Sequence, residues 1–179
     1  MKQSLTAVLA LVTTFAIAAL ANLVFDGPKW DWRTFDFDKD VAYADKKVGA
    51  DINQISPDLS GFKKYGGKLL QYHGWNDPAV SPLNSIHYFE TVKAKMVDTS
   101  SFYRLFMIPG MEHCGGGPGA SSFDHMQVIV KWVEEGIAPD RIVASRPDRT
   151  HPVCAYPNVA KYSGRGNTGD ATNYTCAGE

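Results

Sequence analysis

Residues 66–82 read GGKLLQYHGWNDPAVSP, and this stretch decides how the chain is expected to fold. A glycine pair ends a turn, and the mostly apolar run from Lys68 to His73 has the length and composition of a short buried strand. The loop after it carries Asp77, and Ser81-Pro82 supplies a helix cap and a proline for the first helical turn. The stretch predicts a strand, an acid-bearing loop, and a helix that runs to about Met96.

The same pattern recurs downstream. Residues 102–108 (FYRLFMI) read as a second strand, 109–122 as a glycine-rich loop that carries His113, and 123–135 as an amphipathic helix ended by glycine. A third short strand is expected at 141–145, before a tail without clear periodicity. Alternating strands and helices predict an α/β fold, in which functional groups gather in loops beyond the carboxyl ends of parallel strands. Both Asp77 and His113 would occupy such loops.

Only two or three strands are visible, whereas a parallel sheet is normally larger and covered by helices on both faces. We therefore expect the C-terminal portion of a larger α/β domain, with an incomplete sheet. Upstream, residues 23–40 alternate aromatic and acidic residues without a helical period, 41–48 could form a short helix, and 55–61 are rich in turn formers.

Composition excludes some classes of partner. The chain has 179 residues, of which 44% are hydrophobic, and a formal net charge of −1. It therefore lacks the low hydrophobicity and high charge of a disordered protein. No basic block is present that would follow a phosphate backbone, so nucleic acid is not an expected partner.

The first 21 residues have the features of a secretory signal peptide. Lys2 precedes an uncharged apolar run, which ends in the small-x-small pattern Ala19-Leu20-Ala21. The competing interpretation is a membrane anchor, but the run falls short of the roughly 20 apolar residues that a bilayer span needs. We expect a secreted protein, extracellular or periplasmic, with no membrane contact after cleavage. Three cysteines agree with an oxidising compartment.

Asp77 followed by His113 matches the order of the last two members of a Ser, Asp, His triad. In such a triad the histidine removes the serine proton and returns it to the leaving alcohol, while the acid fixes the imidazole tautomer and stabilises its cation. Glu112 is a poorer candidate for the acid, because the side chains of adjacent residues diverge.

No Gly-x-Ser-x-Gly nucleophile motif occurs in the sequence, and the nearest string, at 119–123, reads better as a helix cap. Spacing alone leaves simpler interpretations open: a histidine in a glycine-rich loop is often a surface residue, and an aspartate before proline often forms a turn. His73, His113 and Cys114 could also suggest zinc, but zinc needs three or four ligands at defined spacing. We interpret His73 as a strand-end histidine with a satisfied hydrogen bond.

The segments GGKLLQYHGWNDP (66–78) and PGMEHCGGG (109–117) resemble the acid and base motifs of the tannase and feruloyl esterase family. The resemblance extends from about Leu23 to the C-terminus. It implies an α/β-hydrolase fold with a large lid inserted before the acid segment, and cleavage of esters of aromatic acids such as gallate or ferulate. Residues 22–65 would then connect the lid back to the hydrolase domain, and 66–179 would be the C-terminal part of that domain.

The resemblance also implies a disulfide pattern. The family joins a cysteine beside the nucleophilic serine to the cysteine beside the catalytic histidine, and Cys114 matches the second of these. The chain has no cysteine at the first position, so Cys114 is expected to lack a partner. Cys154 and Cys176 resemble the family's C-terminal disulfide. Many members hold a structural calcium in the lid, and we assign no cofactor to residues of this chain.

Two hypotheses follow. In the first, the chain derives from a serine-type carboxylic ester hydrolase, supplies Asp77 and His113, and lacks the serine. In the second, it is a secreted fragment, inactive or a non-catalytic module, that the Cys154–Cys176 bridge stabilises. The missing serine motif favours the second for the chain taken alone, and half a parallel sheet would then leave an unpaired strand edge exposed.

Overall fold

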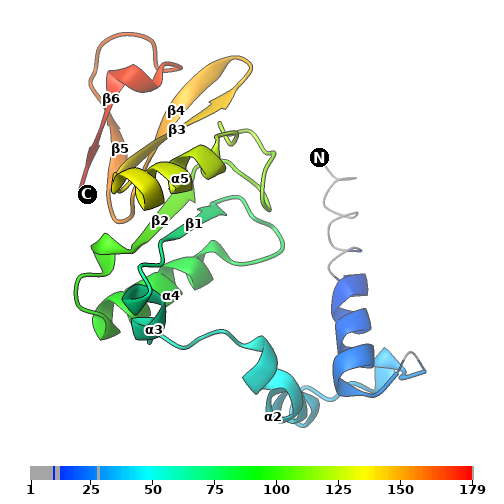
Figure 1. Cartoon of the computed structure of the whole chain (residues 1–179). Helices are drawn as coiled ribbons and strands as arrows, with labels where there is room; N and C mark the ends of the chain where they lie inside the picture. Colours follow the sequence, from blue (N-terminus) through cyan, green and yellow to red (C-terminus); the bar gives the residue numbers. More distant parts are fainter. Residues whose placement is uncertain (1–9, 11–12, 28, 179) are drawn as a thin grey trace. The chain divides into compact units, whose positions relative to one another are not determined.

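The computed structural model describes residue 10, residues 13–27 and residues 29–178 (Figure 1). It divides into two compact units, Met1–Ile55 and Ser56–Glu179, each of which is described by itself. Of the predicted signal peptide, residues 1–9, 11 and 12 lie outside the described residues, and residues 13–19 are helical. No helix in the described part of the chain is both long and apolar enough to cross a membrane.

The first unit contains a π-helical turn η1 (Leu20–Val24), a 3-10 turn η2 (Trp32–Thr34) and the helix α2 (Asp40–Ile52). The helix is longer than the expected 41–48. Its Lys47 ammonium donates to the Val24 carbonyl at 2.5 Å and to the Asp26 carboxylate at 2.7 Å, which connects α2 to the end of η1 and to the turn after it. Aromatic residues of the connecting segment pack together here, with Phe25 stacked on Trp30 at 4.4 Å between ring centroids.

The second unit carries both predicted loops. Its elements are α3 (Ser60–Lys64), β1 (Leu69–Gly74), α4 (Pro82–Lys95), η3 (Thr99–Ser101), β2 (Tyr103–Ile108), α5 (His125–Glu135), β3 (Arg141–Arg146), β4 (Arg149–Cys154), β5 (Val159–Tyr162), η4 (Ala171–Asn173) and β6 (Tyr174–Ala177). Strands β1 and β2 pair in parallel, whereas β3 pairs with β4 and β5 with β6 as antiparallel hairpins. The two predicted strand, loop and helix repeats are thereby confirmed.

Helix ends follow local sequence chemistry. The Asp124 carboxylate accepts a hydrogen bond from the Gln127 amide at 2.8 Å and so caps the start of α5, and Gly136 ends that helix in the left-handed region at φ 71°. Helix α4 begins at Pro82 as expected, but the predicted Ser81 cap is wrong in one respect, because the Ser81 side chain makes no capping hydrogen bond.

Strand β2 is the centre of the core, because its side chains alternate between two packed faces. Tyr103, Leu105 and Met107 pack with the buried face of α4. Phe106 and Ile108 pack on the other side with residues of β3, β4 and the start of α5. Helices α4 and α5 accordingly lie on opposite sides of the β1–β2 pair (Figure 1).

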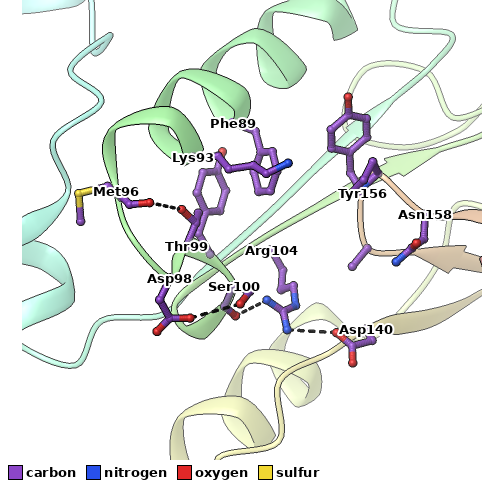
Figure 2. Close-up of a pocket in the computed structure, with 13 residues that line it drawn as sticks. Phe89, Lys93, Met96, Asp98, Thr99, Ser100, Arg104, Asp140, Tyr156 and Asn158 are labelled. Carbon is purple, nitrogen blue, oxygen red and sulfur yellow. Dashed lines mark hydrogen bonds and ion pairs between the residues drawn. The ribbon is translucent and has the colours of Figure 1, made fainter. Parts of the chain in front are cut away.

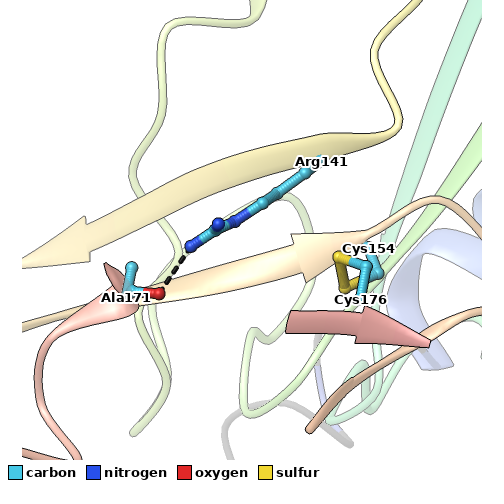
Figure 3. The surroundings of a disulfide bond; sticks show 4 residues. All are labelled: Arg141, Cys154, Ala171 and Cys176. Atoms are coloured by element: carbon cyan, nitrogen blue, oxygen red, sulfur yellow. Dashed lines mark hydrogen bonds between the residues drawn. A yellow bond between two sulfur atoms is a disulfide. The ribbon is translucent and has the colours of Figure 1, made fainter. Parts of the chain in front are cut away.

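The C-terminal tail has no clear periodicity in the sequence, yet it contains the regular elements β4, β5, η4 and β6. Strand β4 pairs with β3, and an antiparallel bridge from Ala155 to Phe106 joins the hairpin to β2. A disulfide connects Cys154 with Cys176, and the Arg141 guanidinium donates to the Ala171 carbonyl at 2.5 Å (Figure 3). Strands as short as β5 and β6 show too few alternations of apolar and polar residues to be detected from the sequence. The disulfide and the Arg141 hydrogen bond hold this part of the chain in place.

Candidate active site

The two predicted loops begin side by side because β1 and β2 are parallel and in register. His73 lies opposite Met107, and Gly74 lies opposite Ile108, at the carboxyl ends of the strands. Beyond the strands the two loop backbones stay in contact, because the amide of Asn76 donates to the Met111 carbonyl at 3.0 Å. Parallel pairing therefore places the acid loop against the base loop.

Gly74 allows this close approach. A Cβ atom at this position would lie 2.2 Å from the Met111 carbonyl oxygen and 2.6 Å from that of Glu112. Real Cβ atoms do not come so near to backbone oxygen, so only glycine fits while the second loop keeps its path. The loop that carries His113 can thus reach across to Asp77.

Asp77 and His113 are hydrogen-bonded, with 2.8 Å between Asp77 Oδ2 and His113 Nδ1. The other carboxylate oxygen, Oδ1, accepts from the amides of Ala79 at 2.8 Å and Val80 at 3.0 Å. Burial raises the pKa of Asp77, but these two amides and His113 outweigh it and lower the pKa to about 2. The carboxylate is therefore ionised at neutral pH and acts only as an acceptor.

The ionised carboxylate determines the tautomer of His113. Because Oδ2 can only accept, Nδ1 must carry the proton, and Nε2 is left as the basic nitrogen. The His113 side chain is 54% exposed, whereas that of Asp77 is only 3% exposed. The geometry is that of a buried acid which orients an accessible base. Among the described residues, Glu112 forms no hydrogen bond with His113.

A second histidine binds the same carboxylate oxygen. His73 Nε2 lies 3.0 Å from Asp77 Oδ2, and His73 Nδ1 lies 2.7 Å from Ser85 Oγ. His73 is a strand-end histidine with satisfied hydrogen bonds, as we interpreted it, and its hydrogen bond to Asp77 was not predicted. The sequence feature that could have indicated this pair is the spacing of four residues between His73 and Asp77, across a strand end and a tight loop.

The chain matches the tannase and feruloyl esterase family over residues 3–177. It belongs to that family. It is 37% identical to an uncharacterized esterase from Xanthomonas campestris, over 87% of this chain and 35% of that protein. It is 44% identical to the mono(2-hydroxyethyl) terephthalate hydrolase of Piscinibacter sakaiensis, over 68% of this chain and 22% of that enzyme.

Solved structures of the tannase and feruloyl esterase family show the same fold. Feruloyl esterase B from Aspergillus oryzae superposes with a TM-score of 0.77 and 32% identity, covering 90% of this chain and 37% of that one. A tannin acyl hydrolase from Aspergillus niger has a TM-score of 0.66 at 23% identity, which supports the fold alone. The expected α/β fold, as part of a larger esterase domain, is confirmed. The chain spans between 22% and 37% of the length of these relatives.

A cavity of about 190 Å³ lies beside the Asp77–His113 pair in this family member. Its lining residues are Tyr72, His73, Gly74, Asp77, Val80, Met111, His113 and Cys114. Cys114 is exposed, has a positive φ of 60° and forms no disulfide within the described residues. Its thiol therefore faces the surroundings of the base rather than the core.

A larger cavity, of about 420 Å³, lies apart from Asp77 and His113 and begins at the amino end of β2 (Figure 2). Arg104 crosses it to Asp140 at 3.1 Å, and its Nε has no hydrogen-bond partner among the described residues. Trp75 lines a third cavity, of about 410 Å³. In the described part of the chain no group of three His, Cys, Asp or Glu side chains is placed to hold a metal ion.

Proposed function

We propose that this chain supplies the acid and the base of a serine-type carboxylic ester hydrolase. The observation that carries the proposal is the 2.8 Å hydrogen bond from exposed His113 to buried, ionised Asp77 at the ends of two parallel strands. The sequence has no Gly-x-Ser-x-Gly segment, and the proposal places the nucleophile outside these 179 residues. Cys114 would pair with a cysteine beside that serine.

In the proposed reaction, His113 Nε2 accepts the serine proton as the serine oxygen attacks the ester carbonyl. The tetrahedral intermediate collapses, and His113 returns the proton to the leaving alcohol. A water molecule then attacks the acyl-enzyme as His113 Nε2 takes one of its protons, and His113 returns that proton to the serine oxygen as the second tetrahedral intermediate collapses, which releases the acid and the free serine. Asp77 keeps the ring in the required tautomer and stabilises the imidazolium formed in each half-reaction.

The proposed substrates are esters of aromatic acids. The named relatives support this class, because one hydrolyses a terephthalate monoester and others are feruloyl esterases. The cavity beside His113 is smaller than the roughly 300–1,000 Å³ of most ligand sites. In the proposal, residues outside this chain therefore form most of the pocket for the acyl group.

We also propose that the protein is exported. The features of residues 1–21 are those of a signal peptide. The Cys154–Cys176 disulfide supports the same conclusion, because such bonds persist mainly in oxidising compartments.

A chimera tests the proposed function. Residues Ser56–Glu179 would replace the corresponding segment of feruloyl esterase B from Aspergillus oryzae, and hydrolysis of methyl ferulate would be measured. We expect an active chimera whose kcat falls by about 10⁴-fold or more in the His113→Ala variant. Glu112→Gln, which removes the adjacent exposed carboxylate, should leave kcat within about threefold of the parent chimera, less than 1 kcal/mol in barrier height.

The purified 179-residue chain is the second arm of the test, and it should not hydrolyse methyl ferulate above background. Activity of the chain alone that His113→Ala abolishes would show that the nucleophile lies within it. A chimera that folds and binds product but keeps its rate in His113→Ala would refute the assignment of the base.

A further inference from the structure

A second histidine, besides His113, holds the Asp77 carboxylate. Its oxygen Oδ2 faces two histidine nitrogens, His113 Nδ1 at 2.8 Å and His73 Nε2 at 3.0 Å. The His73 side chain is 13% exposed and that of His113 is 54% exposed, so His73 is much less accessible, and it reaches the carboxylate from the carboxyl end of β1. The carboxylate thus lies between a working base and a second, nearly buried imidazole.

The surroundings of His73 determine its tautomer. Its Nε2 faces two groups that can only accept, Asp77 Oδ2 and the Val80 carbonyl at 3.3 Å, so this nitrogen carries a proton. The neutral ring then presents Nδ1 as an acceptor, and the Ser85 hydroxyl donates to it at 2.7 Å. Ser85 lies on α4 and is only 8% exposed.

Two further residues fix the direction of that hydroxyl. Gln71 Nε2 donates to Ser85 Oγ at 2.9 Å, which leaves the Ser85 proton for His73. The Tyr103 hydroxyl donates to Gln71 Oε1, which fixes the orientation of the amide. Burial raises the pKa of the Tyr103 phenol, so it remains a donor throughout the pH range in which esterases work. Every donor in the series Tyr103, Gln71, Ser85, His73 points toward Asp77.

We infer that His73 is a positioning residue, which holds the Asp77 carboxylate in place for His113 and is itself held by the hydrogen-bonded series Tyr103, Gln71 and Ser85. This inference rests on the proposed function. The series crosses from the buried side of β2 through β1 and α4 to the loop that carries the acid. It couples the rigid core to the orientation of Asp77, and therefore to the position of the His113 ring.

The first test uses the full chain and does not depend on activity. NMR would measure the tautomer of His73 and the rate at which the His113 Nδ1 proton exchanges with water. We expect His73 to carry its proton on Nε2. In His73→Phe the exchange should become about tenfold faster, because Oδ2 loses one of its two anchors, whereas His73→Gln, whose amide can donate from a similar position, should stay within about twofold.

The second test measures kinetics in the chimera described above. His73→Phe should lower kcat about tenfold to a hundredfold with KM within about twofold, and His73→Gln should recover most of the loss. His87→Phe is the matched control, because His87 is an exposed histidine on α4, and it should change neither quantity. If His73→Phe does not fold, Ser85→Ala removes the donor to Nδ1 and should change both readouts in the same direction, by several-fold.

The outcomes separate this inference from the proposed function. Wild-type exchange and kcat in His73→Phe, or His73 protonated on Nδ1, would overturn the positioning role and leave the esterase proposal standing. An inactive chimera that still shows the exchange effect would overturn the proposed function, while it supports His73 as the residue that positions Asp77.

Discussion

Replacing Asp77 with asparagine removes the charge on which the site depends, while it nearly preserves the shape of the side chain. The carboxylate accepts four hydrogen bonds, two from backbone amides and two from histidines. An asparagine side chain must turn its NH₂ group toward one of these pairs of donors. We therefore expect a less stable protein in which His113 no longer has to carry its proton on Nδ1.

The size of the stability loss in Asp77→Asn follows from the pKa of Asp77, which the folded protein lowers from 3.8 to about 2. A lowered pKa means that the unfolded chain binds the proton first as the pH falls. Above pH 4 the ionised carboxylate therefore contributes about 2 kcal/mol to the free energy of unfolding. This contribution is lost as the pH falls through the folded-state pKa of about 2. Since the side chain is only 3% exposed, solvent screening does not reduce this value much.

The assay is urea unfolding of wild type and Asp77→Asn between about pH 5 and pH 2. The difference in the free energy of unfolding between the two proteins should shrink by about 2 kcal/mol over this range, mostly below pH 4. Glu112→Gln is the control and should show no such change. A difference that stays constant with pH, or that appears equally in Glu112→Gln, would show that the ionised Asp77 carboxylate does not stabilise the fold.

Three further perturbations have separate readouts. Replacing Cys154 and Cys176 together with serine opens a loop of sequence separation 22 and should lower the free energy of urea unfolding by about 3 kcal/mol, and a loss below about 1 kcal/mol would contradict this. Gly74→Ala should displace the second loop and lower the free energy of unfolding by about 1–3 kcal/mol. Gly61→Ala is the control, because a Cβ atom there meets nothing within 4 Å, and it should cause no such loss. Equal unfolding midpoints for the two variants would argue against the close approach of the second loop to Gly74. Asp124→Ala removes the cap of α5 and should lower thermal stability by about 1 kcal/mol, which calorimetry can measure, and an unchanged midpoint would be evidence against capping.

The fold of residues 66–136 could be predicted because its signals are local. Short apolar runs bounded by glycine, and helices that begin at Pro82 and after Asp124, depend on nearby residues. The approach of Asp77 to His113 also follows from sequence, since the ends of adjacent parallel strands meet at one edge of a sheet.

The supporting contacts could not be predicted in the same way. The partners of His73 depend on the β1–β2 register and on the position of Ser85 on α4, which no local pattern encodes. The need for glycine at position 74 comes from the path of a loop almost 40 residues away. Strands β5 and β6 are held by a disulfide and by pairing with each other, not by their own propensity.

The proposed chemistry requires that Asp77 holds His113 with its Nε2 free to accept a proton. Long-range proton–nitrogen NMR on the ¹⁵N-labelled chain, at about pH 8 where histidine is ordinarily neutral, tests it most directly. We expect His113 to carry its proton on Nδ1, with a strongly deshielded resonance that is lost in Asp77→Asn and kept in Glu112→Gln. A proton on Nε2 of His113, or an Nδ1 resonance unchanged by Asp77→Asn, would contradict it.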